Sequence, residues 1–420
     1  MNAWPELTHF AGFDWADDHH DVVVLDRDGA TLDQWTFDHS VEGWTQCRQK
    51  LASYRGKIGV ALETSRGLAV DQLLQADLTL YPIQPLAASR LRDRKAPSGA
   101  KSDRFDAWAL AEGLRLDGHA WKALAPEDPL TLELRLLCRD EVALIQQRTL
   151  LVNQLLAALK EYYPTAVEAF DDWTTASTWD FIIQFPTPER LAQAGRRRWE
   201  KFLHTHNLWR PQTSERRLDA FARALEWKPA TAVVAAKSRL ATSLAGLLHR
   251  LQQELDAYHS RISELFAQHP DHDLFGSLPG AGSTLAPRLL SELGNDRDRF
   301  SSAQSLQCFS GTAPVTFQSG QIHRVRIRRQ CNRYLRHALH LWAQCSRLKC
   351  AWADAYYQGL RARGKSHACA LRCLAQRWLE ILWKMWQQRC PYDAERHLAN
   401  LKKHGSVTLA KILPPRPSTP

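Results

Sequence analysis

The sequence lacks the marks of a membrane or secreted protein. No apolar run approaches the roughly 18 residues that a membrane-spanning helix needs, and the first residues do not resemble a signal peptide. The nine cysteines are scattered along 420 residues instead of being spaced as a disulfide framework. We therefore expect a cytoplasmic protein with reduced thiols and no membrane partner.

Zinc-binding motifs are also missing. Cys345, Cys350, Cys369 and Cys373 lie near His367, but their spacings fit no familiar structural zinc site. Free cysteine is among the most buried residue types, so we interpret these four as buried residues of helices.

Charge is distributed unevenly along the chain. The length suits two or three domains, and the formal net charge is +10. Residues 1–125 carry 14 Lys and Arg against 18 Asp and Glu, a net of −4, so the remainder has a net charge of +14. A basic majority beside an acidic domain suits an enzyme acting on nucleic acid, because cations bind the phosphate backbone and carboxylates hold a metal.

Hydrophobic periodicity and turn signals predict an α/β domain in the first quarter of the chain. Expected strands span residues 8–15, 21–25, 31–37, 57–63 and 79–83, and expected helices span 41–53, 68–75 and 102–114. This βββαβαβα order is that of a ribonuclease-H-like fold, in which the first and fourth strands are neighbours.

Four acidic residues occupy positions that such a fold would bring together. Asp14 lies in the first expected strand, Glu63 ends the fourth, and Asp103 and Asp106 open a helix, where a spacing of three places both on one face. Like charges repel, so four clustered carboxylates require a cation, and a hard ion such as Mg²⁺ (or Mn²⁺) prefers oxygen ligands and shares them with phosphate. Taken singly, each acid is more simply interpreted as a solvated surface residue.

The middle of the chain is expected to be helical. Apolar residues recur at three and four in residues 131–163 and 237–266, flanking a less regular stretch with Pro and Trp at 171–230. This pattern indicates an antiparallel helical pair carrying an insertion; periodicity does not distinguish an intramolecular hairpin from a coiled-coil dimerisation arm. Within the insertion, RRRWEKF at 196–202 is either an RNA-binding cluster or an exposed helix face.

Two glycine-bearing segments near the C-terminus suggest contacts with nucleic acid. Residues 278–282 (LPGAG) precede a helix, as in a helix-hairpin-helix module, although a simple interhelical turn is the alternative.

Ser319 stands before Gly320 in a loop. The segment that follows, Gln321 to Cys350, has eight Arg and Lys and no Asp or Glu. Guanidinium groups stabilise charge developing on phosphorus, but most loop serines form turns, so this chemistry alone does not select Ser319. The candidate nucleic-acid-binding residues are Gly280, Gly282, Arg324, Arg326, Arg328, Arg329, Asn332, Arg333 and Arg336.

Two sets of motifs resemble one known family. GFDWADDHHDVVVLD, ALETSRG and SGAKSDRFDAWALAEGL resemble the N-terminal domain of the DEDD transposases of bacterial insertion sequences, a domain similar to Holliday-junction resolvases. The segment from Leu278 to Leu339 resembles that family's C-terminal transposase domain. Both sets occur in the family's order and together span about 250 residues.

The resemblance implies a bridge-RNA-guided DNA recombinase. The family's catalytic serine precedes a glycine and lies upstream of an Asn-Arg-Tyr-Leu-Arg stretch, which matches Ser319 and residues 332–336. This serine would attack a scissile phosphate to give a covalent phosphoserine, with a metal at Asp14, Glu63, Asp103 and Asp106. The resemblance further implies a homodimer that assembles to a tetramer on donor and target DNA with a guide RNA.

We therefore expect an α/β domain followed by mainly helical domains. The expected boundaries are a ribonuclease-H/resolvase-like metal domain at 1–125, a helical coiled-coil domain with an insertion at 126–270, a C-terminal transposase domain at 271–400 and a disordered tail at 401–420. Two alternatives stay open. One is a metal-only junction resolvase or nuclease in which Ser319 is structural, and the other is an inactive nucleic-acid-binding protein.

Overall fold

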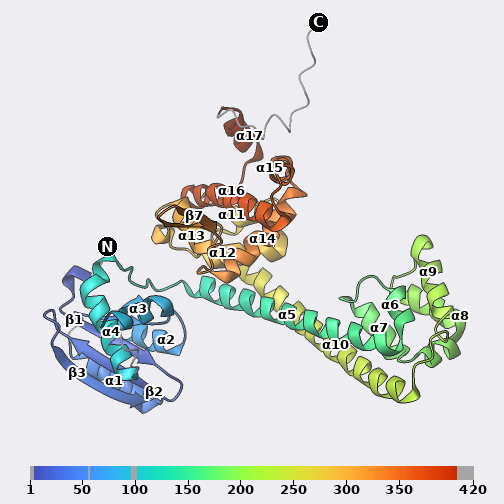
Figure 1. Cartoon of the computed structure of the whole chain (residues 1–420), viewed down its shortest axis with the longest axis horizontal. Coiled ribbons are helices and arrows are strands. Elements are labelled where there is room, and N and C mark those ends of the chain that lie inside the picture. The colour runs from blue at the N-terminus through green and yellow to red at the C-terminus, as the bar shows by residue number, and fades with distance from the viewer. Residues whose placement is uncertain (1–3, 55–56, 96–101, 404–420) are drawn as a thin grey trace, which may run out of the picture. The chain divides into compact units, whose positions relative to one another are not determined.

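The chain folds into two compact units, Met1–Pro126 and Glu127–Pro420, which are described separately. The computed structural model describes residues 4–54, 57–95 and 102–403. The first unit contains a five-stranded sheet and the second is almost entirely helical (Figure 1). The disordered tail expected at 401–420 lies outside the described residues from position 404, and residues 401–403 end helix α17 (Ala394–Lys403).

The sheet of the first unit has the strand order β3-β2-β1-β4-β5. Its strands are β1 (His9–Trp15), β2 (His19–Leu25), β3 (Thr31–Asp38), β4 (Ile58–Leu62) and β5 (Thr79–Pro82). β1 pairs antiparallel with β2 and parallel with β4, so the first and fourth strands are neighbours as the sequence predicts.

Successive side chains of each strand point to opposite faces of the sheet. Both faces carry apolar residues, and helices cover both. On one face Phe13, Val22 and Val60 pack with α1 (Val41–Ala52) and α2 (Leu68–Gln75). On the other face Val23 and Phe10 belong to the cores that include α4 (Asp103–Asp117). Short 3₁₀ helices, η1 (Trp4–Glu6) and η2 (Gly118–Ala120), pack together beside α4.

Helix α3 (Pro85–Lys95) is absent from the sequence-based expectation. Its sequence, PLAASRLRDRK, is rich in charge and has few apolar residues, so its periodicity is weak. Ala88 joins the core against α4, and that tertiary contact rather than intrinsic pattern explains why the segment is helical.

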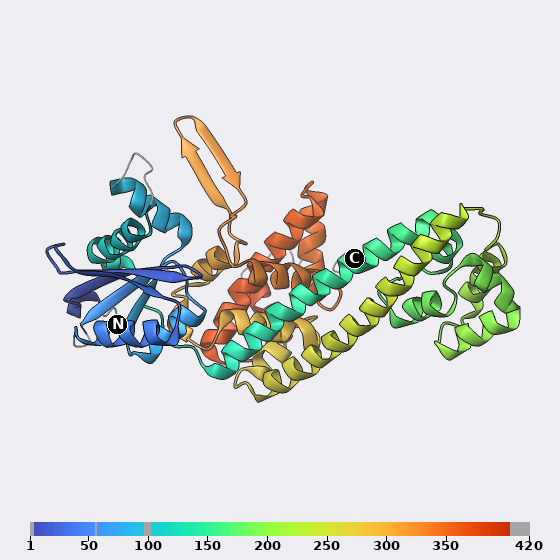
Figure 2. The ribbon, with the colours of Figure 1, turned by 90° about the horizontal axis from the view of Figure 1, so that it is seen from below.

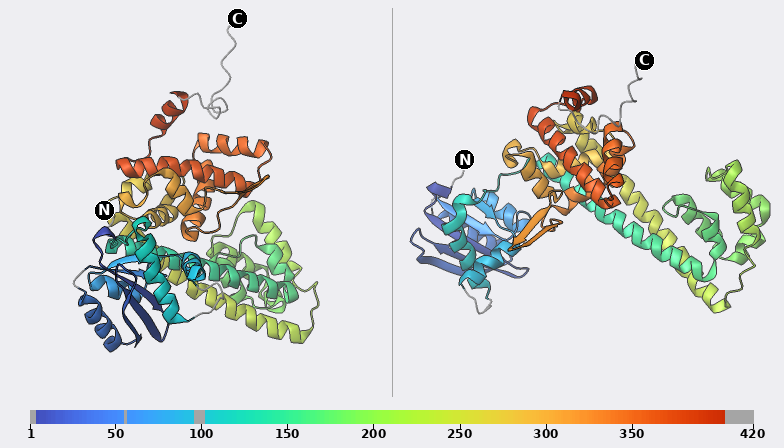
Figure 3. Two further views of the ribbon diagram at one scale, coloured as in Figure 1. Left: turned by 60° about the vertical axis from the view of Figure 1, so that its left-hand side comes forward. Right: turned by 45° about the horizontal axis from the view of Figure 1, so that its top comes forward.

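Two long helices, α5 (Pro129–Tyr162) and α10 (Thr231–Gln268), lie side by side in the second unit (Figures 1 and 3). Glu133 pairs with Arg261 and Glu161 pairs with Lys237, so the two helices are antiparallel. The chain between them is helical, which corrects the expectation of a less regular insertion. Proline opens three of its four helices, α6 (Pro164–Ala169), α7 (Ala176–Gln184), α8 (Pro188–Thr205) and α9 (Pro211–Ala222).

By length and composition, α5 is the one described helix that could cross a membrane. Between Glu141 and Lys160 it has a single charged residue, Arg148. It is therefore an exception to the expectation that no apolar run approaches that length. In this structure it packs along α10, with Val152 and Leu155 in the core of the insertion.

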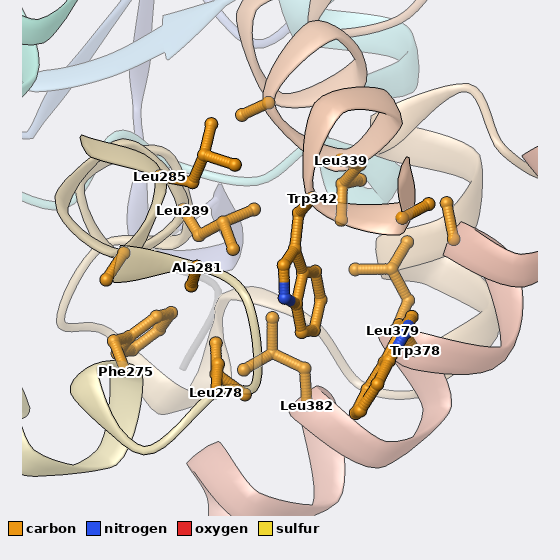
Figure 4. Close-up of a cluster of buried hydrophobic side chains, with 14 of the residues drawn as sticks. Phe275, Leu278, Ala281, Leu285, Leu289, Leu339, Trp342, Trp378, Leu379 and Leu382 are labelled. Atoms are coloured by element: carbon orange, nitrogen blue, oxygen red, sulfur yellow. The ribbon is translucent and has the colours of Figure 1, made fainter. Parts of the chain in front are cut away.

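The C-terminal part of the chain packs on the other end of the α5–α10 pair. Its helices are α11 (His272–Gly276), α12 (Gly282–Leu293), η3 (Arg297–Arg299), α13 (Ala303–Ser310), α14 (Arg333–Arg347), α15 (Ala351–Ala362), α16 (His367–Gln388) and α17. Figure 4 shows Trp342 and Trp378 facing each other in this core, and their ring centroids are 4.7 Å apart. Leu134 of α5 and Ile262 of α10 belong to the same core, so these helices link it to the insertion.

The segment around Ser319 is a β-hairpin, not the irregular loop that the sequence suggested. β6 (Val315–Ser319) pairs antiparallel with β7 (Ile322–Arg326), and all ten residues are exposed. Figure 2 shows the two strands projecting from the helices of their own unit.

Candidate functional site

The close packing of α4 on β1 places the acidic residues. Gly12 lies on the α4 face of β1, where an added Cβ would stand 1.8 Å from the carbonyl oxygen of Ala107. Asp14 is two residues further along the strand and therefore projects toward the same face. Asp103 and Asp106 lie in the first turn of α4, which Ser102 caps by accepting a hydrogen bond from the amide of Phe105.

Three of the four predicted carboxylates converge. Oxygen atoms of Asp14, Asp103 and Asp106 lie within 4.8 Å of one another. Asp106 is 6% exposed, and its Oδ2 accepts a hydrogen bond from Nη1 of Arg92 at 2.7 Å. Its Oδ1 is buried and has no hydrogen-bond partner among the residues that the structure describes. Because a buried acceptor without a partner costs about 1–3 kcal/mol, this atom fits a site for a hard divalent cation.

Glu63 lies at the same edge of the sheet but outside this close group. Phe13 and Leu62 are the last paired residues of β1 and β4, and Asp14 and Glu63 follow them directly. Ala61 packs on the α4 side, so the alternation of the strand directs Glu63 toward that side as well. Asp14, Glu63, Asp103 and Asp106 thus share one edge and one face of the sheet.

Sequence reasoning missed His19 and Asp21, which form a second group with Asp103. Asp21 pairs with Asp14 across the β1–β2 ladder and is 7% exposed, and its Oδ1 accepts from Oγ1 of Thr36 at 2.7 Å. The Nε2 atom of His19 lies 3.7 Å from Oδ2 of Asp103 and 4.0 Å from Oδ2 of Asp21. The alternation in HHDVVVL places Asp21 on the face of Val23, and this was the available signal.

The neighbouring His20 has a structural role on the opposite face. It is fully buried among aromatic rings, including Phe13 and Trp44, and its Nε2 lies 2.8 Å from Nδ1 of His39. Burial, with a smaller effect from the charges of His39 and His19, lowers the pKa of His20 to about 4. His20 is therefore neutral at pH 7 and supports the strand without adding positive charge beside the carboxylates.

Ser319 is the last residue of β6 and stands at the turn of the exposed hairpin. It pairs with Ile322 across a two-residue turn in which Gly320 has a φ of 55°. Directly opposed residues of antiparallel strands share a face, so Ser319 lies on the face of Arg324 and Arg326. The guanidinium of Arg326 stands 5.6 Å from the ring centroid of Phe317 on that same face.

The base of the hairpin is tied to the helical core. The side chain of Asn332 accepts from the amide of Leu335 as the N-cap of α14 and donates to Oε2 of Glu292 at 2.6 Å. Glu292 also binds Arg139 of α5 through both carboxylate oxygens. Asn332 is therefore engaged in protein contacts. Of the other predicted binding residues, Arg324, Arg326, Arg329 and Arg333 are exposed, while Arg328 and Arg336 are half-buried.

The two predicted glycines of the LPGAG turn differ in their surroundings. Gly280 and Gly282 have φ values of 77° and 57°, in the left-handed region that favours glycine. An added Cβ on Gly280 would stand 2.7 Å from the backbone of Cys345, whereas no atom of the described residues lies within 4 Å of the same position on Gly282. The turn thus packs on α14 at Gly280, and Gly282 opens α12 on the accessible side.

The basic and aromatic parts of RRRWEKF face different environments. Trp199 and Phe202 are buried in the core of the insertion, and Trp199 donates to the carbonyl of Leu191. Arg197, Arg198 and Lys201 are exposed. This segment is an amphipathic helix with an exposed basic side, which is compatible with both interpretations.

The fold and site define a class of protein. An α/β unit carries a cluster of carboxylates that suits a divalent metal, and a basic helical unit follows it in the chain. Comparison with known proteins agrees with this class. Residues 11–164 match a DEDD family of the IS110 type described as "Transposase", and residues 272–358 match the "Transposase IS116/IS110/IS902 family".

Curated relatives match over most of the chain. It is 33% identical over 407 residues to the "Mini-circle putative transposase for IS117" of Streptomyces coelicolor, covering 94% of this chain and 98% of that protein. It is 30% identical over 319 residues to the IS110 43.6 kDa protein of the same organism, covering 74% and 76%. It is 26% identical over 397 residues to the IS116 44.8 kDa protein of Streptomyces clavuligerus, covering 90% and 95%. The chain belongs to the IS110/IS116 family of insertion-element transposases, which are DNA-cleaving and strand-transferring enzymes.

Proposed function

We propose that this transposase cleaves and rejoins DNA through a phosphoserine at Ser319, assisted by Mg²⁺ or Mn²⁺ at Asp14, Glu63, Asp103 and Asp106. The observation that carries the metal site is the buried, unpartnered Oδ1 of Asp106 beside Asp14 and Asp103. The strand order, with parallel β1 and β4 at its centre and α4 across one face, supports a ribonuclease-H-like, resolvase-like unit.

The residues of the chain have distinct parts in this chemistry. A bound divalent metal would supply charge stabilisation on the phosphoryl oxygens and a lowered barrier to proton loss. The Oγ of Ser319 attacks phosphorus, a bond forms between them, and the bond from phosphorus to the leaving nucleotide oxygen breaks. The serine proton passes to water or a carboxylate, and the departing oxygen takes up a proton. Arg324 and Arg326, on the face of Ser319, stabilise the negative charge that develops.

The assembly state is part of the same proposal. By family resemblance, the chain acts as a homodimer that becomes a tetramer on donor and target DNA, and a guide RNA pairs with both. Exposed leucines along the α5–α10 pair support contact between copies as a coiled-coil arm: Leu150 is 62% exposed, Leu247 is 55% and Leu240 is 44%. Contiguous patches of exposed apolar residues commonly mark an interface.

A denaturing gel separates this mechanism from hydrolysis. The full-length chain is incubated with Mg²⁺, the RNA that it retains on purification and a nicked DNA substrate that blocks rejoining. Serine attack leaves protein on the DNA after denaturation, whereas an activated water leaves none. The DNA-linked species should disappear in Ser319→Ala, and mass spectrometry should place the adduct on Ser319. Thr316→Ala, on the other face of the same strand, is the matched control and should retain it.

The alternative is a metal-only resolvase or nuclease, which the carboxylate cluster by itself favours. The metal-only mechanism predicts a different result on the gel. DNA is cut without a protein adduct, and cutting persists in Ser319→Ala. Retained RNA is tested in the same preparation, because RNase treatment before DNA addition should remove recombination. Full recombination after RNase treatment would exclude guidance by RNA.

A further inference from the structure

A hollow of about 590 Å³ lies at the root of the β6–β7 hairpin. It is bordered by α13, by the residues that enter and leave the hairpin, and by α16. Its volume falls within the range of about 300–1,000 Å³ that small-molecule sites occupy. Neither Ser319 nor any residue of the carboxylate cluster lines it. The hollow is therefore separate from the groups that carry the proposed chemistry.

Part of the wall of this hollow suits a flat ring. The lining residues that carry no charge and no strong hydrogen-bonding group in the side chain are Ala303, Cys308, Ala313 and Pro314. Ligand sites combine such walls with a few polar groups that fix the orientation of the ligand. The polar groups in this hollow are therefore the ones that select what it binds.

The guanidinium of Arg328 brings an unused donor to the hollow. Arg328 follows the hairpin and lines the hollow, and its Nε is buried with no hydrogen-bond acceptor among the described residues. A buried donor without an acceptor is costly, and more so when it is charged. The unpartnered Nε indicates a ligand that has an acceptor atom.

A carboxylate stands in the same hollow without neutralising this guanidinium. Glu380 of α16 lines the hollow, and in the described part of the chain no ion pair within 4.0 Å joins it to Arg328. Its Oε1 accepts from Nε2 of Gln307 at 3.3 Å, and its Oε2 accepts from Nη1 of Arg377 at 2.9 Å. Gln307 is 5% exposed and also donates to the carbonyl of Gln376 at 3.0 Å, so a buried amide orients the carboxylate. Because a carboxylate has about four lone-pair positions, Glu380 can accept two further hydrogen bonds.

The two separated charges restrict the chemistry of the ligand. The carboxylate of Glu380 repels a phosphate, and an apolar ligand would leave both charges without partners. A nucleobase has two flat faces and carries donors and acceptors along its edges. Among the common bases, guanine has two adjacent N–H donors, at N1 and N2, which match the two oxygens of a carboxylate. It also has two adjacent acceptors, O6 and N7, which match a guanidinium.

We infer that the hollow binds one unpaired guanine base of a nucleic acid, with Glu380 accepting from N1 and N2 and Arg328 donating to O6 and N7. The base must be unpaired, because pairing occupies N1, N2 and O6. The site is therefore compatible with pairing between a guide RNA and DNA, which takes place elsewhere along the strands. The guanine belongs either to a loop of the RNA, a source that rests on the proposed function, or to an unpaired position of the DNA.

Short probes measure the selectivity for guanine. Fluorescein-labelled pentathymidines, whose central base is guanine, hypoxanthine, adenine or cytosine, are titrated with the RNase-treated full-length chain, and binding is followed by anisotropy. Hypoxanthine differs from guanine only in lacking the amino group at N2. The guanine probe should bind about tenfold more tightly than the hypoxanthine probe, because one hydrogen bond to a charged acceptor is lost. Equal affinity for all four probes would overturn the inference.

Two substitutions assign this selectivity to residues. Glu380→Gln keeps an acceptor for Gln307 and should remove the preference for guanine over hypoxanthine. Arg328→Gln should remove the preference for guanine over 7-deazaguanine, which lacks N7. Arg329→Gln is the matched control, because it removes the same charge from the exposed neighbouring residue and should weaken all probes alike. Guanine preferences that survive in Glu380→Gln and Arg328→Gln would refute the assignment.

Alkylation of Cys308 reports whether the hollow is occupied in the wild-type chain. A saturating guanine probe should slow the labelling of Cys308 by iodoacetamide at least about fivefold, because thiol reactivity depends on access. Cys390 is also half-buried but does not line the hollow, so its labelling rate should not change. Mass spectrometry measures both rates. Unchanged labelling of Cys308 under saturating probe would place the probe elsewhere and overturn the inference.

The same alkylation distinguishes the two sources of the guanine. If retained RNA supplies it, Cys308 should be protected in the purified chain and become reactive after RNase treatment. If DNA supplies it, protection should appear only when the DNA substrate is added. Protection by neither would overturn the assignment to nucleic acid.

This inference and the proposed function fail separately. Guanine selectivity without a phosphoserine adduct would support the hollow and refute the serine mechanism. An adduct at Ser319 without guanine selectivity would support the mechanism and refute the hollow.

Discussion

The two regions that we propose to act together are held in contrasting ways. The carboxylates stand on a fully packed sheet, where Asp106 is 6% exposed and Gly12 fits against α4 with no room for a side chain. Ser319 stands at the tip of a hairpin whose ten strand residues are all exposed. A metal site needs several ligands held close together before the metal binds, whereas a nucleophile on an arm is positioned by the substrate. The contrast is between a carboxylate group held in place by packing and a serine held on an exposed hairpin.

The largest effect is expected from removing the packed carboxylates. Asp14→Ala or Asp106→Ala should lower DNA cleavage about a thousandfold, which is the scale of losing a preorganised electrostatic group. Glu63→Ala should behave in the same way, and removal of Mg²⁺ should mimic each variant. Asp117→Ala is the control, because Asp117 lies on the same helix in an exposed pair with Arg94. A folded Asp14→Ala variant with wild-type recombination would show that Asp14 does not belong to a catalytic metal site.

Hydrogen exchange measures the contrast directly. Amides in the β1–β4 ladder should exchange at a rate set by global unfolding, whereas those of β6 and β7 should exchange with little protection. We expect protection factors to differ by more than about a thousandfold in the free protein. Adding DNA should raise protection in the hairpin. Equal protection in both regions of the free protein would show that the hairpin is as stably folded as the sheet.

The anchor at the base of the hairpin gives the next largest effect. Glu292→Ala leaves the guanidinium of Arg139 and the amide of Asn332 without their acceptor, and breaking one partner of a buried ion pair costs about 3–5 kcal/mol. Denaturant unfolding of the second unit measures the loss. Glu254→Ala removes an exposed partner of Arg250 and should change stability by less than about 1 kcal/mol. Similar losses in both variants would mean that the Glu292 network does not anchor the hairpin.

Gly12 tests how strictly the first unit is packed. Gly12→Ala should destabilise this unit by about 1–3 kcal/mol, because the new Cβ must push α4 away from β1. Cleavage should fall as well, since Asp103 and Asp106 move with α4. Gly246→Ala, in α10 with nothing near the added Cβ, should instead be neutral or stabilise by up to about 1 kcal/mol. An unchanged melting temperature in Gly12→Ala would show that α4 is free to shift.

The smallest expected effect is a pH dependence in the second unit. Burial lowers the pKa of His269 below its usual value of 6.5, an effect partly opposed by Asp271 and Asp128. The folded state therefore binds fewer protons than the unfolded state just below pH 6.5, so stability should fall as pH decreases from 7 through this window. His269→Gln should flatten the unfolding free energy measured between pH 7 and 5.5. If the pH dependence of the unfolding free energy is unchanged by this substitution, other titratable groups cause it.

Part of the fold could be predicted from the sequence because its signals are local. The apolar runs in DVVVL and KIGVALE identified two strands, and the order of elements placed the first and fourth strands together, as β1 and β4 are. Helix α3 escaped detection because its helicity depends on packing of Ala88 rather than on its own pattern. The hairpin around Ser319 escaped because its turn, Gly320-Gln321, lies in a segment of mixed polarity. The boundary at residue 270 and the roles of the site residues stay predictions.

By itself, the sequence determined the family and the candidate residues for its chemistry. Acidic residues in strand and helix-start positions, the uneven charge and the motifs around Ser319 are properties of the chain in order, so they identified the family and the candidate quartet. Only the tertiary structure decided which acids meet, because that depends on contacts between distant segments. Packing of Gly12 against Ala107 brings α4 to β1, Arg92 of α3 reaches Asp106, and Asp21 lies across the ladder from Asp14. This packing buries Oδ1 of Asp106 away from water without giving it a hydrogen-bond donor among the described residues. The atom is therefore a suitable ligand for a cation.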